Sequence, residues 1–264
     1  MRALAVLCLV GCNFEHGALS TDATMGTSDT QIDGTQQDCG THDWDGDGHF
    51  DSCDHCPHLP STMDPDGDGD GVGDDCDPRP TQPGDARVIW IAFYDPSDII
   101  GWKNTGGTGA WSVSGGLLHE TNGGFSLLDA PASYQDAYFA TSLEVVQSTT
   151  NEIGFCLSDI QPSTQYYCCA ASNPGNTPSV RAASQYAGSP GQISAPASFA
   201  GNLGVGQHIQ MVGSLMGTRF DCAFTQGGAT STANTTVGGK LGPPVFYTTT
   251  PVNYRYAFVV TIGS

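Results

Sequence analysis

Two short acidic segments carry aspartate at alternate positions, a pattern that suits cation binding. The segments DWDGDGHFDSCD (43–54) and DGDGDGVGDDCD (66–77) share one frame of twelve positions, which begins at Asp43 in the first and at Asp66 in the second. Aspartate stands at positions 1, 3, 5, 9 and 12, glycine at position 6 and cysteine at position 11. A hard cation such as calcium takes about six to eight oxygen ligands, which a chain curling around the ion supplies from alternate side chains and one backbone carbonyl. The register therefore predicts two calcium sites.

The frame also names the ligands. Glycine at position 6, Gly48 or Gly71, permits the sharp turn that a side chain would block. The first site would use the carboxylates of Asp43, Asp45, Asp47, Asp51 and Asp54 and the backbone carbonyl of His49, and the second the carboxylates of Asp66, Asp68, Asp70, Asp74 and Asp77 and the backbone carbonyl of Val72. Because five carboxylates in one loop repel one another, we expect each loop to expand without calcium and to become compact with it.

Three other interpretations of these segments are open. An EF-hand shares the spacing, but position 12 is Asp rather than the longer Glu, and cysteine and proline stand where its flanking helices should be. A solvated acidic linker would not keep aspartates, glycines and cysteines in phase. Zinc would use Cys53, Cys56 and His58, which have ligand-like spacing, but it needs free thiolates and leaves the aspartates unexplained. Calcium is the favoured cofactor.

The pattern DWDGDGHFDSCDHCP followed by DGDGDGVGDDCDPRP resembles the thrombospondin type 3 repeat over about residues 40–80, and we assign 38–80 to it. The resemblance implies Asp-rich loops that wrap calcium, with disulfides between cysteines consecutive along the chain. These would be Cys39 with Cys53 and Cys56 with Cys76. A decayed copy lies upstream (Asp29, Gln31, Asp33, Gly34, Gln37); with two carboxylates it should bind weakly or not at all. Extracellular modules of this kind bind calcium at about 10⁻⁴–10⁻³ M, so the ion would be structural.

The N-terminus has the features of an export signal. Arg2 precedes the short apolar run ALAVLCLV, and LVGC (9–12) resembles the bacterial lipobox, which would make Cys12 the lipidated first residue. An ordinary cleaved signal or a buried first strand is the alternative. Residues 1–12 would then be signal and lipobox, and 13–37, rich in Ser, Thr, Asp and Gly, a flexible tether. By the same resemblance, Asn13 favours an exported protein at the outer membrane or cell surface.

Charge and cysteine content agree with an extracytoplasmic location. The formal net charge is −19, and 14 of the 27 acidic residues lie between residues 38 and 85. No basic patch is present, so nucleic acid and direct binding to anionic membrane surfaces are poor candidates, and any membrane contact would be through the lipid. Beyond Cys8 and Cys12, four cysteines remain in the acidic region and four after it, and even numbers suit disulfides in an oxidising compartment.

A different composition begins near residue 88. A proline-rich linker (81–87) precedes short stretches rich in Val, Ile, Tyr, Phe and Thr, separated by Gly, Pro, Asn and Ser about every eight to twelve residues. This spacing predicts a mainly β fold, an antiparallel sandwich with about eleven strands, and suits a jelly roll over 88–264. If EIGFCLSDI and QYYCCAAS form a hairpin, Cys156 lies opposite Cys168 while Cys169 points to the other face. We therefore pair Cys156 with Cys168 and Cys169 with Cys222. Free buried cysteines are the alternative.

The stretch FYDPSDIIGWKNTGGTGAWSVSGGLL and the closing strand YRYAFVVTI resemble the concanavalin A-like (laminin G-like) jelly-roll superfamily over nearly all of 88–264. The resemblance implies that the first and last strands lie side by side. That superfamily includes lectins, adhesion modules and glucanases, so the fold cannot choose among them.

Catalysis is not indicated by the residues present. Glycoside hydrolysis needs two carboxylates about 5–9.5 Å apart, and the three glutamates of this domain, Glu120, Glu144 and Glu152, are isolated in sequence. No Gly-x-Ser-x-Gly motif occurs, and we interpret His119 and His208 as ordinary sandwich residues. A glycan hydrolase with a carboxylate pair assembled across strands is the alternative.

The leading hypothesis is a calcium-binding surface lipoprotein whose jelly-roll domain recognises polysaccharide or a surface protein from a calcium-stiffened stalk. A purely structural envelope protein is a further alternative. Aromatic candidates for ligand contact are Trp102, Trp111, Tyr166, Tyr167, Tyr186 and Tyr247, although most aromatics in a sandwich belong to the core. Asp95 and Asp98 are either calcium ligands at the rim or caps of a turn.

Overall fold

The structure is a computed structural model, and it describes residues 39–147, 152–159, 165–173, 177–186, 189–193, 197–237 and 241–263. The predicted signal, Cys12, the tether and the decayed upstream repeat lie outside the described residues. The chain divides into two units, Met1–Cys39 and Gly40–Ser264, and the second contains both the acidic loops and the β-rich region. In the described part of the chain, no helix is both long and apolar enough to cross a membrane.

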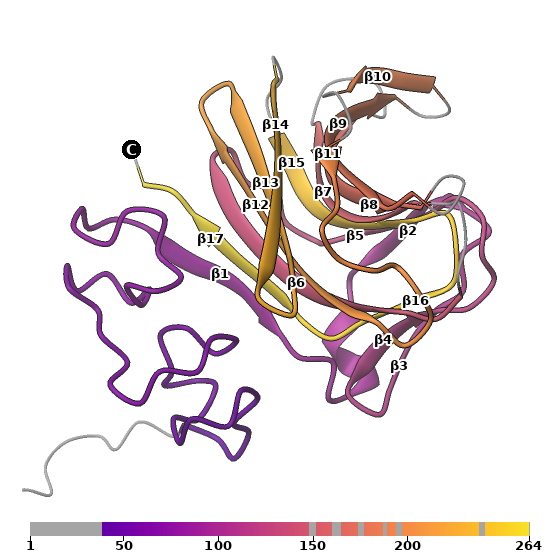
Figure 1. Cartoon of the computed structure of the whole chain (residues 1–264). Coiled ribbons are helices and arrows are strands. Elements are labelled where there is room, and N and C mark those ends of the chain that lie inside the picture. The colour runs from indigo at the N-terminus through magenta and orange to yellow at the C-terminus, as the bar shows by residue number, and fades with distance from the viewer. Residues whose placement is uncertain are drawn as a thin grey trace, which may run out of the picture. The chain divides into compact units, whose positions relative to one another are not determined.

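Two antiparallel sheets form the β-rich region (Figure 1). Sheet A comprises β1 (Ala86–Ile91), β3 (Trp111–Ser114), β4 (Leu117–Glu120), β6 (Ala137–Val145), β12 (His208–Met216), β13 (Arg219–Gln226), β14 (Ala229–Thr236), β16 (Val252–Tyr254) and β17 (Ala257–Thr261). Sheet B comprises β2 (Lys103–Gly107), β5 (Ser126–Asp129), β7 (Glu152–Asp159), β8 (Gln165–Ser172), β9 (Ser179–Tyr186), β10 (Ser189–Ile193), β11 (Ala197–Ser198) and β15 (Leu241–Thr248). The predicted jelly-roll sandwich is confirmed.

Strand order brings the two ends of the domain together. Sheet A runs β14-β13-β12-β6, and the far edge of β6 pairs with β17 along one half and with β16 along the other. β16 continues to β4 and β3, while β17 pairs with β1. Sheet B runs β10-β9-β8-β7-β15-β5-β2. The first and last strands are therefore neighbours, as the superfamily resemblance implied.

Alternate residues of the strands face the space between the sheets. β12, for example, alternates buried with half-buried residues along its length, as a strand with one covered face should. The core between the sheets is rich in aromatic rings, such as Phe139 packed edge-to-face on Phe155 with ring centres 5.1 Å apart. The hydroxyl of the fully buried Tyr254 in sheet A donates to the carbonyls of Gly154 and Tyr247 in sheet B, at 2.8 and 2.7 Å.

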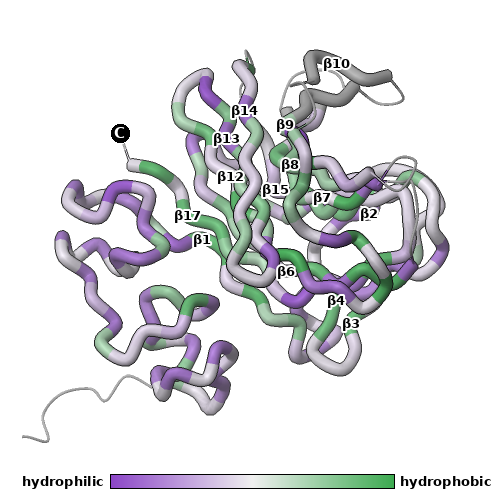
Figure 2. The backbone as a smooth tube through the Cα atoms, viewed as in Figure 1, coloured by the Kyte–Doolittle hydropathy of each residue, from purple (hydrophilic) through white to green (hydrophobic). Residues whose placement is uncertain are grey.

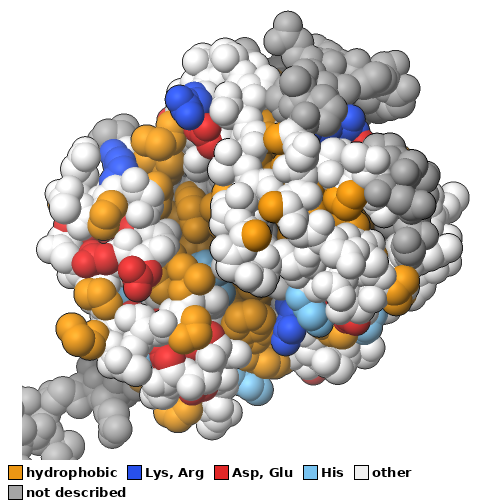
Figure 3. Space-filling view, viewed as in Figure 1, with side chains coloured by type: hydrophobic (Ala, Val, Ile, Leu, Met, Phe, Trp, Pro, Cys, Tyr) orange, Lys and Arg blue, Asp and Glu red, His pale blue; other side chains and the backbone are white. Residues whose placement is uncertain are grey.

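The acidic segment packs against the outer face of sheet A. Residues 40–85 contain almost no regular secondary structure and are hydrophilic along most of their length (Figure 2). A few apolar and aromatic side chains nevertheless join a second buried cluster with Tyr256 and Phe258 of the sandwich. Trp44 meets Tyr256 edge-on with ring centres 4.8 Å apart, and His58 lies 4.3 Å from Phe258. In Figure 3, hydrophobic side chains gather between the loops and the strands.

The predicted linker 81–87 is anchored towards its C-terminal end. Asp85 is only 2% exposed, forms an ion pair with Arg79 and accepts from the backbone N–H of Gly263 at 2.8 Å. Arg87 already belongs to β1, and its guanidinium donates to the backbone carbonyl of Asp54 in the first acidic loop. These contacts hold the loops to the sandwich at the point where the chain enters it.

Three disulfides have the predicted pairing. Cys56 joins Cys76 within the acidic segment, Cys156 joins Cys168 across the β7–β8 ladder, and Cys169 joins Cys222. The last bond links the two sheets, because β8 belongs to sheet B and β13 to sheet A. Because the four cysteines of the sandwich are all paired, the alternative of free buried cysteines is wrong. Cys39 and Cys53 are also disulfide-bonded.

Candidate metal centre

The two acidic loops have the same internal hydrogen bonds. At position 1, Asp43 accepts from the backbone N–H groups of Gly46 and Gly48, and Asp66 accepts from Gly69 and Gly71, all within 2.8–3.1 Å. At position 9, Asp51 Oδ1 accepts from Trp44 N and Asp74 Oδ1 from Gly67 N, at 2.8 and 2.7 Å. The repeat in the sequence is therefore a repeat of one folded loop.

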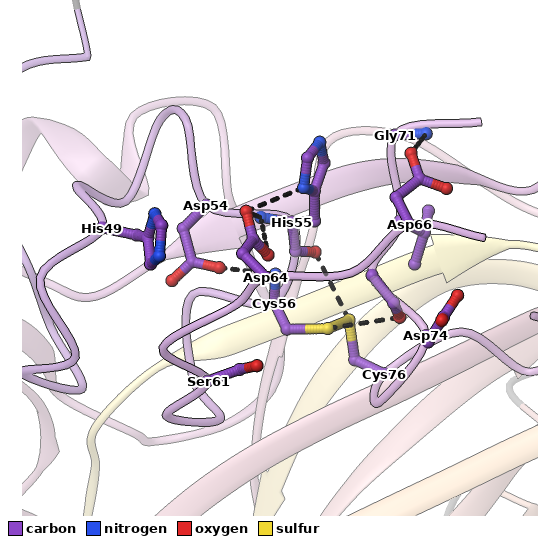
Figure 4. A network of polar contacts seen from close by, with 12 residues as sticks. His49, Asp54, His55, Cys56, Ser61, Asp64, Asp66, Gly71, Asp74 and Cys76 are labelled. Atoms are coloured by element: carbon purple, nitrogen blue, oxygen red, sulfur yellow. Dashed lines mark hydrogen bonds and ion pairs between the residues drawn. A yellow bond between two sulfur atoms is a disulfide. The ribbon is translucent and has the colours of Figure 1, made fainter. Parts of the chain in front are cut away.

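The remaining frame positions repeat in the same way. At position 5, Asp47 accepts from the N–H of His49 and Asp70 from that of Val72, at 2.8 and 3.1 Å. At position 12, Asp54 accepts from Cys56 N and Asp77 from Arg79 N, at 2.7 and 2.6 Å. Figure 4 shows the bond at Asp54 beside the Cys56–Cys76 disulfide.

Position 5 also ties each loop to the chain that follows it. The second oxygen of Asp47 accepts from Ser61 N at 2.7 Å, and that of Asp70 accepts from Gly84 N at 3.0 Å, so the two bonds occupy equivalent places in the repeat. Asp70 further accepts from Asp85 N at 2.7 Å. Each carboxylate thus folds the following chain back onto its loop, which fixes the loop without helices on either side.

Glycines at positions 4 and 6 have backbone angles that side chains avoid. Gly46 and Gly69 have φ of 81° and 79°, and Gly48 and Gly71 have φ of 102° and 92°. An L-residue with a side chain is disfavoured there by roughly 1–2 kcal/mol. The sequence predicted this requirement at position 6; position 4 adds a second left-handed residue to each turn.

The carboxylates at positions 1, 3 and 5 converge in both loops. One oxygen each from Asp43, Asp45 and Asp47 lies within 4.8 Å of the others, and the same holds for Asp66, Asp68 and Asp70. At position 3, Asp45 Oδ2 and Asp68 Oδ2 are buried and have no hydrogen-bond partner. An all-oxygen donor set with an unpartnered buried oxygen fits a hard cation such as calcium.

Crowding and burial also disfavour the charged forms of several of these groups. Burial, and next the charge of Asp47, raise the pKa of Asp45 to about 6. Burial raises the pKa of Asp54 to about 7, with further contributions from the charges of Asp45 and Asp64. The positive charge near the first loop therefore does not offset the burial and crowding of its carboxylates, and a divalent cation would supply more.

A third convergence was not predicted from the sequence. One oxygen each from Asp70, Asp77 and Asp85 lies within 4.8 Å of the others. Asp77 is 9% exposed, and burial raises its pKa to about 6. Asp85 lies outside the twelve-position frame. It reaches the cluster because Asp70 accepts from the backbone N–H groups of Gly84 and Asp85 and so folds this part of the chain back onto the loop. The ion pair with Arg79 supplies part of the positive charge at this cluster.

The disulfides and the burial of His58 exclude the zinc alternative. Cys56 is bonded to Cys76, and Cys53 is also in a disulfide, so neither offers the thiolate that zinc requires. His58 is 4% exposed and packs among aromatic rings. His49 remains at the surface of its loop, with Nε2 3.5 Å from the carbonyl of Thr62.

The other candidate residues lie apart from the loops. Asp95 and Asp98 cap the short 3-10 helix η1 (Pro96–Ile99), because Asp95 accepts from Ser97 N and Asp98 accepts from Asp95 N; this is the capping alternative. Trp102, Trp111 and Tyr167 pack in or against the core between the sheets, whereas Tyr166 and Tyr247 belong to a smaller buried cluster that includes Cys156 and Cys168. The side chain of Tyr186 lies outside the described residues. No aromatic candidate converges with another on an open site in the described part of the chain.

Comparison with known proteins identifies the fold of the sandwich. No protein-family model matches the sequence, and no curated protein matches it. Among solved structures, the CBM2 module of the evolved Dit of Lactobacillus casei BL23 phage J-1 is similar at a TM-score of 0.52 and 13% identity, over 68% of this chain and 97% of that one. The carbohydrate binding module CBM66 from Bacillus subtilis is similar at 0.46 and 13%, over 59% and 92%. A basic winged bean lectin with Tn-antigen is similar at 0.49 and 8%, over 67% and 99%. The first similarity supports the jelly-roll fold of this domain.

Proposed function

We propose that this chain is a calcium-binding recognition protein, in which two calcium loops brace a jelly-roll domain that binds carbohydrate. The observation that carries the proposal is the duplicated loop, whose carboxylate-to-backbone hydrogen bonds recur at equivalent positions of both copies. In both copies the carboxylate at position 3 keeps a buried oxygen without a partner. A bound calcium ion would supply positive charge there, and Asp43, Asp45 and Asp47, or Asp66, Asp68 and Asp70, would hold it.

The carbohydrate part of the proposal is supported by fold class. The sandwich has the fold of a module named CBM2, and that similarity extends over 97% of the module. At a sequence identity of 13%, the binding residues of that module cannot be assigned to positions of this chain. The site must therefore come from the surface of this chain.

We propose that the domain is not an enzyme, because two of its three glutamates already have structural roles. Glu120 is 1% exposed and accepts from the backbone N–H groups of Asn122 and Gly123. Glu152 pairs with Arg181 and accepts from the hydroxyl of Tyr247 at 2.9 Å. A hydrolytic pair would need two carboxylates facing one glycosidic bond. A reducing-sugar assay on any glycan that the protein binds tests this; release of reducing ends would favour the hydrolase.

We further propose that the chain is exported and anchored through a lipid on Cys12. The disulfide bonding of all eight cysteines from Cys39 onward supports an oxidising compartment. Metabolic labelling with a radioactive fatty acid tests the anchor. The wild type should incorporate label and Cys12→Ser should not; label that stays on Cys12→Ser would exclude Cys12 as the lipidated residue.

Calorimetric titration of the full chain with calcium tests the loops. We expect Asp45→Asn and Asp68→Asn each to weaken calcium binding at least tenfold in one loop, because each removes a charged ligand. Asp75→Asn is the matched control, since Asp75 lies in the second loop, is exposed and falls outside the ligand frame; its affinity should stay within twofold of the wild type. Heats without saturation in the wild type, or equal losses in Asp68→Asn and Asp75→Asn, would count against calcium.

A further inference from the structure

A groove of about 460 Å³ opens between the first acidic loop and the outer face of sheet A. Asp43 and Trp44 of the loop line it, together with Tyr94, which follows β1. The β3–β4 turn at Gly115 and Gly116 also lines it, with backbone rather than side chains. The volume falls within the range of about 300–1,000 Å³ that small-molecule sites occupy.

The floor of the groove belongs to a row of polar side chains that crosses the strands of sheet A. His208 of β12 stands opposite Glu144 of β6, which stands opposite Asn253 of β16, which stands opposite His119 of β4. Residues opposite one another in a ladder point to the same face of the sheet. These four therefore share the outer face, and His208 and Glu144 line the groove itself.

Hydrogen bonds hold this row in place. Asn253 Nδ2 donates to Glu144 Oε2 at 3.2 Å, and Asn253 Oδ1 lies 2.7 Å from His119 Nδ1. His119 Nε2 in turn lies 3.0 Å from both the hydroxyl and the carbonyl of Ser114. The chain of contacts engages one carboxylate oxygen of Glu144, which leaves the other as an acceptor for a ligand at a fixed position.

An aromatic ring and a cation form the wall above this floor. The guanidinium carbon of Arg255 lies 5.7 Å from the centre of the Trp44 ring, and both residues are half-buried. Tyr256 supports the same ring edge-on from the sandwich side. The groove thus combines a fixed carboxylate, a histidine, a guanidinium and an indole. The polar groups can exchange hydrogen bonds with the hydroxyl groups of a sugar. The indole offers an aromatic ring against which the C–H face of a pyranose can pack.

The wall is also part of the first calcium loop. Asp51, at position 9, accepts from Trp44 N at 2.8 Å with one oxygen and from the hydroxyl of Tyr94 at 3.1 Å with the other. The second loop has Gly67 at the position of Trp44, so only the loop beside the groove has a ring there. Ordering of the first loop by calcium would therefore fix two groove residues at once.

We propose that this groove binds a neutral mono- or disaccharide unit of a glycan, and that calcium in the first loop is required because it positions Trp44 and Tyr94. The inference rests on the proposed function and locates its site. Since coupling between two ligands is reciprocal, the bound glycan should also tighten calcium binding by the factor by which calcium tightens glycan binding.

The test is an array of microbial, plant and animal oligosaccharides probed with the full chain, in millimolar calcium and in chelator. We expect the wild type to bind a set of glycans in calcium and to lose at least tenfold of that binding in chelator. Glu144→Gln and His208→Ala should each weaken the same binding at least tenfold in calcium. Glu144→Gln retains an oxygen for Asn253, so it should leave the fold intact, which a thermal melt checks.

Asp221→Asn is the matched control. Asp221 faces outward on the same sheet, opposite Ser214 of β12, and does not line the groove. Its variant should bind within twofold of the wild type. Glycan binding that survives both groove variants would overturn the site and leave the proposed function standing, and binding that is equal in chelator would overturn the calcium requirement. A wild type that binds no glycan would instead remove the recognition function itself, and with it this inference.

Discussion

His58 is a titratable side chain enclosed by aromatic rings where the acidic loops meet the sandwich. It is 4% exposed, lies 4.3 Å from the Phe258 ring and 5.2 Å from that of Tyr256, and neither ring nitrogen has a hydrogen-bond partner. Burial, and next the charge of Arg87, lower its pKa to about 3. The folded protein therefore holds this histidine neutral.

The lowered pKa predicts a loss of stability in acid. The folded pKa lies below the ordinary value of 6.5, so the contribution of neutral His58 is complete above pH 6.5 and is lost as the pH falls towards 3. At pH 4.5 the wild type should have lost about 2–3 kcal/mol from this group. Urea unfolding in chelator at pH 7 and at pH 4.5 measures this loss. In His58→Phe the free energy of unfolding should fall between the two pH values by about 2–3 kcal/mol less than in the wild type. His42→Phe, at an exposed ring, is the control; equal slopes in all three proteins would contradict the prediction.

The residues of the loops were easier to predict from the sequence than those of the groove. A calcium loop is local, so its ligands follow one another along the chain, and their register is visible in the printed sequence. Glu144, His208 and Asn253 come together only through the pairing of three strands distant in sequence. His208 and His119 were interpreted as ordinary sandwich residues because no local pattern marks them. The alternation of outward polar residues was the only available signal.

The elements show a similar division. Strands with alternating buried residues, such as β6 and β12, have a pattern that is visible in the sequence, whereas β2 and β14 do not. β14 reads ATSTANTT and covers its inner positions with only Ser231 and Ala233. It lies at the edge of sheet A and β2 at the edge of sheet B, each paired along one side. An edge strand buries less side chain than a central one, so its sequence carries less apolar signal.

The two disulfides of the sandwich should differ in their contribution to stability. Cys156–Cys168 closes a separation of 12 residues within one hairpin, and Cys169–Cys222 closes 53 residues between the sheets. On the chain-entropy model the shorter loop contributes about 3 kcal/mol and the longer about 4 kcal/mol. We expect the Cys169→Ala, Cys222→Ala variant to be less stable in urea than the Cys156→Ala, Cys168→Ala variant by about 1 kcal/mol. Equal midpoints would show that residual structure in the unfolded chain already closes the longer loop.

At the scale of the whole molecule, the loops and the sandwich share a buried cluster. Val72 and the Cys56–Cys76 disulfide are buried with Tyr256 and Phe258, and Arg87 reaches from β1 to the carbonyl of Asp54. The stalk was expected to be separate from the domain, but residues 40–264 form one compact unit. The sequence contains the apolar residues of this cluster, yet a few hydrophobic side chains in an acidic segment do not reveal which strands they contact.

The shared cluster predicts that calcium stabilises the sandwich as well as the loops. A ligand that binds only the folded state adds RT ln(1 + [L]/Kd), which at 10 mM calcium and a Kd of about 10⁻⁴–10⁻³ M is about 1.5–3 kcal/mol for each site. Two sites should raise the melting temperature of the full chain, with disulfides intact, by on the order of 10 °C relative to chelator. Calorimetry should show one transition that moves as a whole, because loosening residues 43–77 uncovers Tyr256 and Phe258. The Asp45→Asn, Asp68→Asn double variant should lose most of the shift, and Asp75→Asn should keep it. A sandwich transition that stays in place while a smaller one moves would mean that the loops fold independently and that the contacts of Trp44 and His58 contribute little to the domain.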